Sequence, residues 1–104
     1  MADAKNTVSE KERQAYAERL QAEIDSWNAD INRLRSKVKV ASAEAQHAYT
    51  EEIEKIEAKR DALEERFSAL KTANAGAWSD VKQGVERAWR DMSSAMTKAV
   101  DRFQ

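Results

Sequence analysis

The last quarter of the chain carries an eleven-residue repeat. The pattern Ala-Trp-x-Asp followed by an apolar residue occurs at Ala77–Val81 and again at Ala88–Met92, and a weaker copy occupies Ala99–Phe103. Eleven residues make almost three whole helical turns, so equivalent positions return to nearly the same face. The repeat therefore predicts an amphipathic helix over residues 77–103. Its apolar stripe comprises Trp78, Val81, Val85, Trp89, Met92, Met96, Val100 and Phe103.

Composition favours helix for the rest of the chain. The 104 residues include no proline and two glycines, and 36% are charged, which is typical of long helices and coiled coils. The net charge of −1 offers no basic excess for nucleic acid, so we expect no nucleic-acid binding. Without cysteine, disulfides and thiol chemistry are excluded. A polar N-terminus and the lack of a membrane-length apolar run predict a cytoplasmic protein.

Residues 1–8 are predicted to be a disordered lead-in to a single helical domain over residues 9–104. Ser9 and Glu12 have the spacing of a capping box at a helix start, and Thr7 with Glu10 is an equally spaced rival. Apolar residues then recur in steps of three and four, as in a coiled-coil seam. This first seam comprises Tyr16, Leu20, Ile24, Trp27, Ile31, Leu34, Val38 and Ala41.

The seam changes phase near residue 45, and two architectures follow. A second seam comprises Tyr49, Ile53, Ile56, Leu63, Phe67 and Leu70. In the first architecture the chain turns somewhere in residues 41–48 and forms a three-helix bundle. In the second, residues 9–73 form one helix, and two chains pair antiparallel about a two-fold near residue 45. The second is favoured by propensity, because no Gly, Pro or Asn lies at the phase shift.

The charged residues predict ion pairs between and along the helices. Folding about residue 45 would bring Lys39 near Glu51 and Arg33 near Glu57, and either architecture satisfies this pairing. Along single helices, Glu51 is spaced to pair with Lys55, and Glu86 with Arg90.

The one clear break lies at residues 74–76. Gly76 is predicted to close the preceding helix in the left-handed conformation, and Asn74 tolerates that conformation too. Asp80 then adds a negative charge to the first turn of the last helix. Gly84 interrupts this helix, which predicts a close helix contact there.

No constellation for catalysis is evident, and we expect no enzyme activity and no cofactor. The single histidine, His47, forms Glu-x-x-His with Glu44, a spacing found in di-iron bundles. Such sites need two of these motifs and further carboxylates, so we interpret His47 as a solvent-facing residue and expect no metal site. Glutamate pairs such as Glu64 with Glu65 are interpreted as parts of a solvated face.

The tryptophan stripe has two interpretations. As a core, Trp78 and Trp89 would fill space between helices, which is the usual role of such residues at helical spacing. As an exposed surface, the stripe with its flanking cations would bind a membrane or a partner protein. The acidic residues on the same helix weaken attraction to anionic lipid.

Three segments resemble a family of small bacterial coiled-coil stress-response proteins from cyanobacteria and proteobacteria. They are Arg13-x-x-Tyr16 followed by Leu20, the segment Ile24–Ile31, and above all Ala77–Trp89. The resemblance implies a soluble, all-helical, stress-associated protein without catalytic residues. We therefore expect a non-enzymatic helical scaffold that acts through coiled-coil self-association as a homodimer or by packing against a protein partner. The alternative hypothesis is a peripheral membrane-surface protein that binds through residues 77–103.

Overall fold

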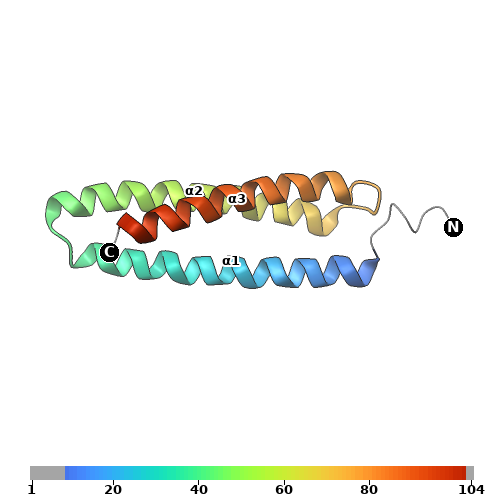
Figure 1. Ribbon diagram of the computed structural model, residues 1–104, viewed down its shortest axis with the longest axis horizontal. Coiled ribbons are helices and arrows are strands. Elements are labelled where there is room, and N and C mark those ends of the chain that lie inside the picture. Colours follow the sequence, from blue (N-terminus) through green and yellow to red (C-terminus); the bar gives the residue numbers. More distant parts are fainter. Residues whose placement is uncertain (1–8, 103–104) are drawn as a thin grey trace.

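The computed structural model describes residues 9–102 and shows an antiparallel bundle of three helices (Figure 1). These are α1 (Glu10–Lys39), α2 (Ala43–Thr72) and α3 (Trp78–Arg102). The bundle is elongated, with principal extents of 63 × 20 × 18 Å. The predicted all-α class is confirmed, and of the two predicted architectures the structure shows the three-helix bundle.

The start of α1 agrees with the Ser9 half of the predicted capping box. Ser9 is the N-cap, and its side chain accepts a hydrogen bond of 3.1 Å from the backbone N–H of Glu12. This bond satisfies one of the amide groups that a helix leaves unpaired at its first turn. The rival cap, Thr7, and the rest of the predicted lead-in lie outside the described residues.

For the single chain, the favoured continuous helix over residues 9–73 is wrong, because α1 ends at Lys39. Val40 follows in a bridging conformation, and Ser42 is extended, with φ −63° and ψ 159°. The Ser42 hydroxyl accepts a 3.3 Å hydrogen bond from the Ala45 N–H and so starts α2. The chain thus reverses without Gly, Pro or Asn, and the packing of the helices stabilises the reversal.

An ion pair joins α1 to α2, but it is not one of the predicted pairs. Arg35, rather than Arg33, forms an ion pair with Glu57. Residues two apart on a helix lie about 200° apart around its axis, so only one of the two arginines faces α2. Arg33 instead pairs with Asp30 at 3.5 Å on α1. Intrahelical pairs also differ from expectation: Glu51 contacts His47, and Glu86 contacts Lys82.

The second connection, residues 73–77, reverses the chain through Asn74 and not through Gly76. The Asn74 side-chain oxygen accepts a 2.9 Å hydrogen bond from the Ala77 N–H, and its carbonyl accepts one of 3.0 Å from Trp78. No residue in 9–102 has a positive φ, so the predicted left-handed Gly76 is wrong. The extended backbone of Ala73 ends α2 without a left-handed residue, and Asn74 caps the first turn of α3. Asp80 lies in the first turn of α3, as predicted.

The predicted seams of α1 and α2 form the core together with α3. The leucines and isoleucines of both seams are buried, as is Phe67, and the remaining seam residues are half-buried. Each fully buried large apolar side chain contributes about 1.5–3 kcal/mol. The buried seam residues are Leu20, Ile24, Ile31, Leu34, Ile53, Ile56, Leu63, Phe67 and Leu70, and the half-buried ones include Tyr16, Trp27, Val38 and Tyr49.

Candidate functional site: the α3 stripe and its aromatic contacts with α1

Most of the predicted α3 stripe lies in the core. Trp78 is 5% exposed and Val85 and Met92 are 0% exposed, with Met96 also buried. Val81 and Trp89 are half-buried against the same core. Val100 is 43% exposed and lies outside the buried part of the stripe. Phe103 lies outside the described residues.

The eleven-residue repeat misplaced Val100 because it drifts away from the true stripe. Burial on α3 follows steps of three and four, through Ala88 and Ala99 rather than through Val100. Around the helix axis, a heptad stripe rotates by about 20° in every seven residues. An eleven-residue repeat rotates by about 20° per repeat in the opposite sense. After two repeats the mismatch reaches roughly 100°. Ala88 and Ala99 were missed because small residues carry little signal in an apolar pattern.

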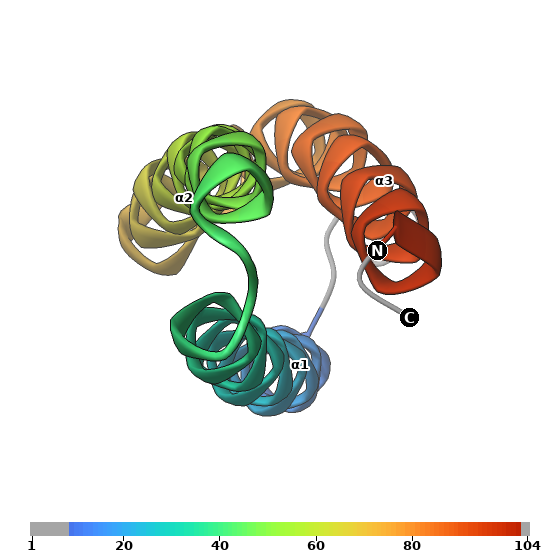
Figure 2. The ribbon, with the colours of Figure 1, turned by 90° about the vertical axis from the view of Figure 1, so that its left-hand side faces the viewer.

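Two pairs of aromatic rings join α3 to α1. The Tyr16 and Trp78 rings meet edge to face with centroids 5.4 Å apart, and the Trp27 and Trp89 rings meet at 4.4 Å with an angle of 46°. Figure 2 shows α1 farther from α3 than α2 is, and these large side chains bridge that distance. Such ring pairs contribute about 0.5–1.5 kcal/mol beyond their burial.

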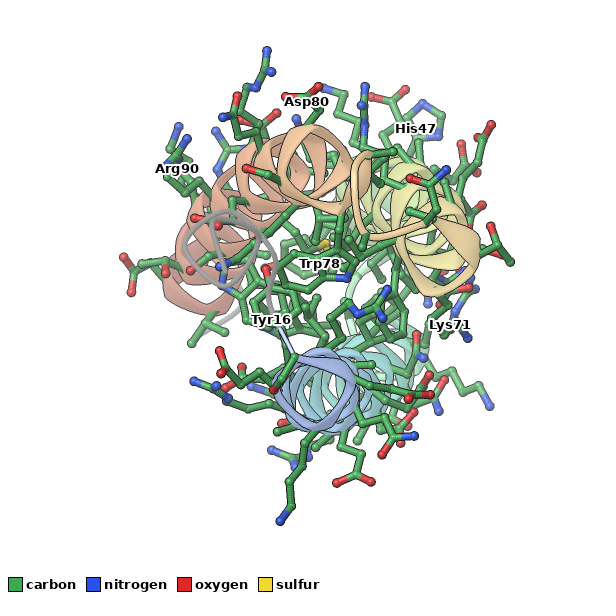
Figure 3. All side chains as sticks on the ribbon, turned by 90° about the vertical axis from the view of Figure 1, so that its right-hand side faces the viewer. Tyr16, His47, Lys71, Trp78, Asp80 and Arg90 are labelled. Atoms are coloured by element: carbon green, nitrogen blue, oxygen red, sulfur yellow. The ribbon has the colours of Figure 1, made fainter. Side chains whose placement is uncertain are left out.

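Lys82 covers the outer edge of one ring pair. Its Nζ lies 4.9 Å from the centroid of the Tyr16 ring and 5.2 Å from that of Trp78, and it is 3.9 Å from Glu86. In Figure 3, Tyr16 and Trp78 lie between α1 and α3. Partial burial, and then the Glu86 carboxylate, raise the pKa of the Tyr16 hydroxyl, and Arg19 opposes that rise. The pKa shift follows because both causes disfavour a phenolate.

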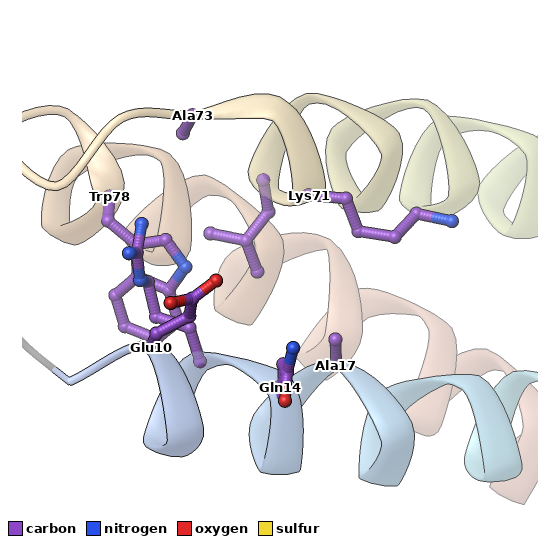
Figure 4. A pocket seen from close by; sticks show the side chains of 8 residues that line it. Glu10, Gln14, Ala17, Lys71, Ala73 and Trp78 are labelled. Carbon is purple, nitrogen blue, oxygen red and sulfur yellow. The ribbon is translucent and has the colours of Figure 1, made fainter.

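Two cavities flank the aromatic contacts. One of about 380 Å³ lies between α1 and α3, and its charged lining is balanced: Arg19 and Lys82 against Glu23 and Glu86. The other, of about 230 Å³, lies at the end of the bundle where α1 begins (Figure 4). Its lining includes Arg13, whose Nε is buried without a hydrogen-bond partner.

His47 lies far from these contacts on the outer face of α2. Its side chain is 83% exposed, and its Nε2 is 3.3 Å from a Glu51 carboxylate oxygen. Within residues 9–102, no group of three His, Asp or Glu side chains gathers as a metal site would require. The single chain carries one Glu44–His47 motif, whereas di-iron sites need two.

No protein-family model matches the chain, and comparisons with curated proteins and with solved structures found no significant match. Each described helix also lacks an apolar stretch long enough to cross a membrane. The geometry of the helices is therefore the basis for any functional proposal.

Proposed function

We propose that the protein is a non-enzymatic helical scaffold that associates with a second copy of itself by exchanging α1. The observation that carries this proposal is the connection at residues 40–42. Its three residues are all compatible with helix and none has a positive φ, and the turn is held by the Ser42 cap and by a 3.2 Å hydrogen bond from Gln46 Nε2 to the Ala41 carbonyl. Val40, at 87% exposure, contributes almost nothing to the core.

Straightening this connection would merge α1 and α2 into one helix of roughly 95 Å, at 1.5 Å per residue. The chain would lose a cap of about 1 kcal/mol, which is small beside the burial of a single large apolar side chain. Every contact between α1 and the α2–α3 pair could then form again between two chains, because identical elements are exchanged. The fold thus supports a closed monomer and an exchanged dimer with the same core.

The packing of α1 supports its role as the exchanged helix. The α2 and α3 backbones run close together, whereas α1 is held to α3 mainly by the aromatic pairs (Figure 2). The resemblance of the tryptophan repeat to bacterial stress-response proteins supports a stress-associated role in the cytoplasm as part of this proposal.

The test is light scattering of the purified chain over a wide concentration range. Replacing the cap and the exposed residue (Val40→Ala with Ser42→Ala) favours a straight helix, so we expect a larger dimer fraction than in the native chain. Replacing Val40 and Ala41 by Asn-Gly should favour the turn and the monomer. A matched control is Ser36→Ala, which removes an exposed serine within α1. Strictly monomeric native and alanine variants at every concentration would refute the exchange.

The alternative proposal, binding to a membrane surface through α3, is favoured by one observation. The stripe of α3 is covered by α1 along the loosest interface of the bundle, and Trp89 is half-buried there beside the 380 Å³ cavity. Movement of α1 would uncover an amphipathic helix that carries two tryptophans.

Tryptophan emission with anionic liposomes separates the two proposals. A Trp27→Phe background leaves Trp78 and Trp89 as reporters. Blue-shifted emission that does not change on adding lipid would support the scaffold. Emission that moves to shorter wavelength on adding lipid would support the membrane proposal.

A further inference from the structure

The outer surface of the bundle has three grooves, one between each pair of helices, and their charges differ. The α1–α3 groove is balanced, as described above. The α1–α2 groove is also balanced, because Arg35 and Lys39 face Glu54 and Glu57 there, and Arg35 is ion-paired. The α2–α3 groove is strongly basic. Its lining cations are Lys55, Lys59, Arg66, Arg87, Lys98 and Arg102.

Few acidic residues offset these cations. Two carboxylates line the α2–α3 groove: Glu52, which is bonded to Arg102 at 3.1 Å, and Asp91. The other five cations have no ion pair within residues 9–102. A chain with a net charge of −1 has therefore concentrated unpaired positive charge in one groove. Such a concentration attracts an anionic partner and steers its approach.

The groove is continuous and of regular shape. It comprises cavities of about 250 and 430 Å³, which share Lys59 and Asp91 in their linings. The cations are four and seven residues apart on α2 and eleven and four residues apart on α3, so they form one row on each helix. From Lys55 to Arg66 on α2, and from Arg87 to Lys98 on α3, the rows extend roughly 17 Å, or three helical turns.

The floor of the groove between these rows is formed by small and apolar residues, with Asp91 and Ser94 also in the lining. It includes Ala62 and Ala88 at one end and Ile56 and Ala95 at the other. Small residues let a third backbone approach to the usual interaxial distance of about 8–10 Å. A flat bilayer would contact the cations at the rim and leave this floor empty.

We propose that the α2–α3 groove binds an acidic amphipathic helix of a partner protein, which would complete a four-helix arrangement. The partner presents carboxylates on both edges of a stripe of small apolar residues, over at least three turns. This is the helix-in-groove mode of recognition with charge-complementary rims. The proposal concerns a different surface from the exchange of α1 and does not depend on it.

The test uses a designed peptide as the probe, a labelled 22-residue helix with an Ala/Leu stripe flanked by glutamates. Chemical shifts of the ¹⁵N-labelled full-length protein should change along residues 55–66 and 87–98. Affinity should fall as salt is raised, since the charges are near the surface. A peptide of the same length with lysine in place of glutamate is the negative control and should not bind.

Charge reversal locates the site. Lys55→Glu with Lys98→Glu should weaken binding roughly tenfold or more, because both rims then repel the peptide. The neutral pair Lys55→Gln with Lys98→Gln should give an intermediate loss. The matched control, Lys11→Glu with Lys37→Glu, makes the same charge change at exposed positions of α1 and should leave affinity within about twofold. Circular dichroism confirms that each variant is folded.

Two further probes decide the class of the partner. Vesicles containing phosphatidylserine and a single-stranded RNA are titrated under the same conditions. The proposal is overturned if either binds through the groove cations while the acidic peptide does not. It is also overturned if the peptide fails to bind, or binds equally well to the charge-reversed groove.

Discussion

The α2–α3 and α1–α3 interfaces belong to one bundle but are built from different side chains. Between α2 and α3, compact residues such as Leu63, Val85 and Met92 are 0% exposed, and the backbones run close together. Between α1 and α3, half-buried Tyr16 and Trp27 extend across a wider separation. Close packing of compact residues allows little movement, whereas ring contacts at the edge of a core are more easily separated. We infer that α2 and α3 form a stable hairpin onto which α1 docks.

The largest expected effect is from truncation within the hairpin. Leu63→Ala removes a side chain with no exposed surface, and we expect a loss of about 2–5 kcal/mol in the free energy of unfolding. Urea denaturation followed by circular dichroism measures this loss. Because the hairpin is the platform for α1, all three helices should unfold together in this variant. A loss below 1 kcal/mol, on the order of a surface substitution, would contradict the close packing assigned to this interface.

The aromatic bridge to α1 is tested by a double-mutant cycle. Trp27→Leu and Trp89→Leu are made singly and together, and urea denaturation gives the coupling energy. The ring centroids lie 4.4 Å apart, so we expect a coupling of about 0.5–1.5 kcal/mol. Additive effects would show that the two rings contribute only through separate burial, and that the pair does not hold α1 to α3.

The contact between α2 and α3 at Gly84 is tested by Gly84→Ala. A methyl group at Gly84 would lie 3.0 Å from Arg66 Nη1 on α2, which supports the predicted close contact at this glycine. The terminal part of an exposed arginine can move, while alanine gains up to about 1 kcal/mol of helix propensity over glycine. We therefore expect a small increase in the melting temperature. A decrease would mean that the contact with α2 requires glycine.

The smallest expected effect is the pH dependence from Tyr16. Its pKa is raised in the folded state, so between the unfolded and folded pKa values the folded protein binds the proton more tightly. The stabilising contribution is complete below about pH 10 and is lost as the pH rises through the folded pKa. We expect Tyr16→Phe to lose less stability than the native chain between about pH 9 and pH 11. Equal losses would contradict the shift.

The pKa shift itself can be read by absorbance. In a Tyr49→Phe background, Tyr16 is the only tyrosine in the chain, so its titration is observed directly. A midpoint at or below that of a free tyrosine would contradict the partial burial of the hydroxyl between α1 and α3.

The sequence predicted the elements and the core well because these depend on periodic burial. Steps of three and four identified nearly every buried large residue of α1 and α2, and the Ser9 cap is a local signal that needs no tertiary information. The turn at residues 40–42 was predicted less well. A single serine is a weak break signal, and the choice between a turn and a straight helix depends on packing energies that local propensity does not contain.

The candidate sites were harder to predict from the sequence. The aromatic partners of Trp78 and Trp89 are residues on α1 that lie over sixty positions away, so their pairing required the bundle register. The basic groove likewise cannot be recognised from the sequence alone, because its cations come from two separate segments and are interleaved with acidic residues. Only the antiparallel alignment of α2 with α3 brings the two rows together.

Native-state hydrogen exchange, measured residue by residue by NMR, tests most directly whether α1 opens separately from the α2–α3 hairpin. We expect amides in the centre of α1, residues 20–34, to exchange through an opening that costs at least about 1 kcal/mol less than global unfolding. Amides of residues 53–70 and 85–99 should exchange only through global unfolding. Equal protection in all three helices would contradict the separate opening of α1 and, with it, the helix exchange proposed for this protein.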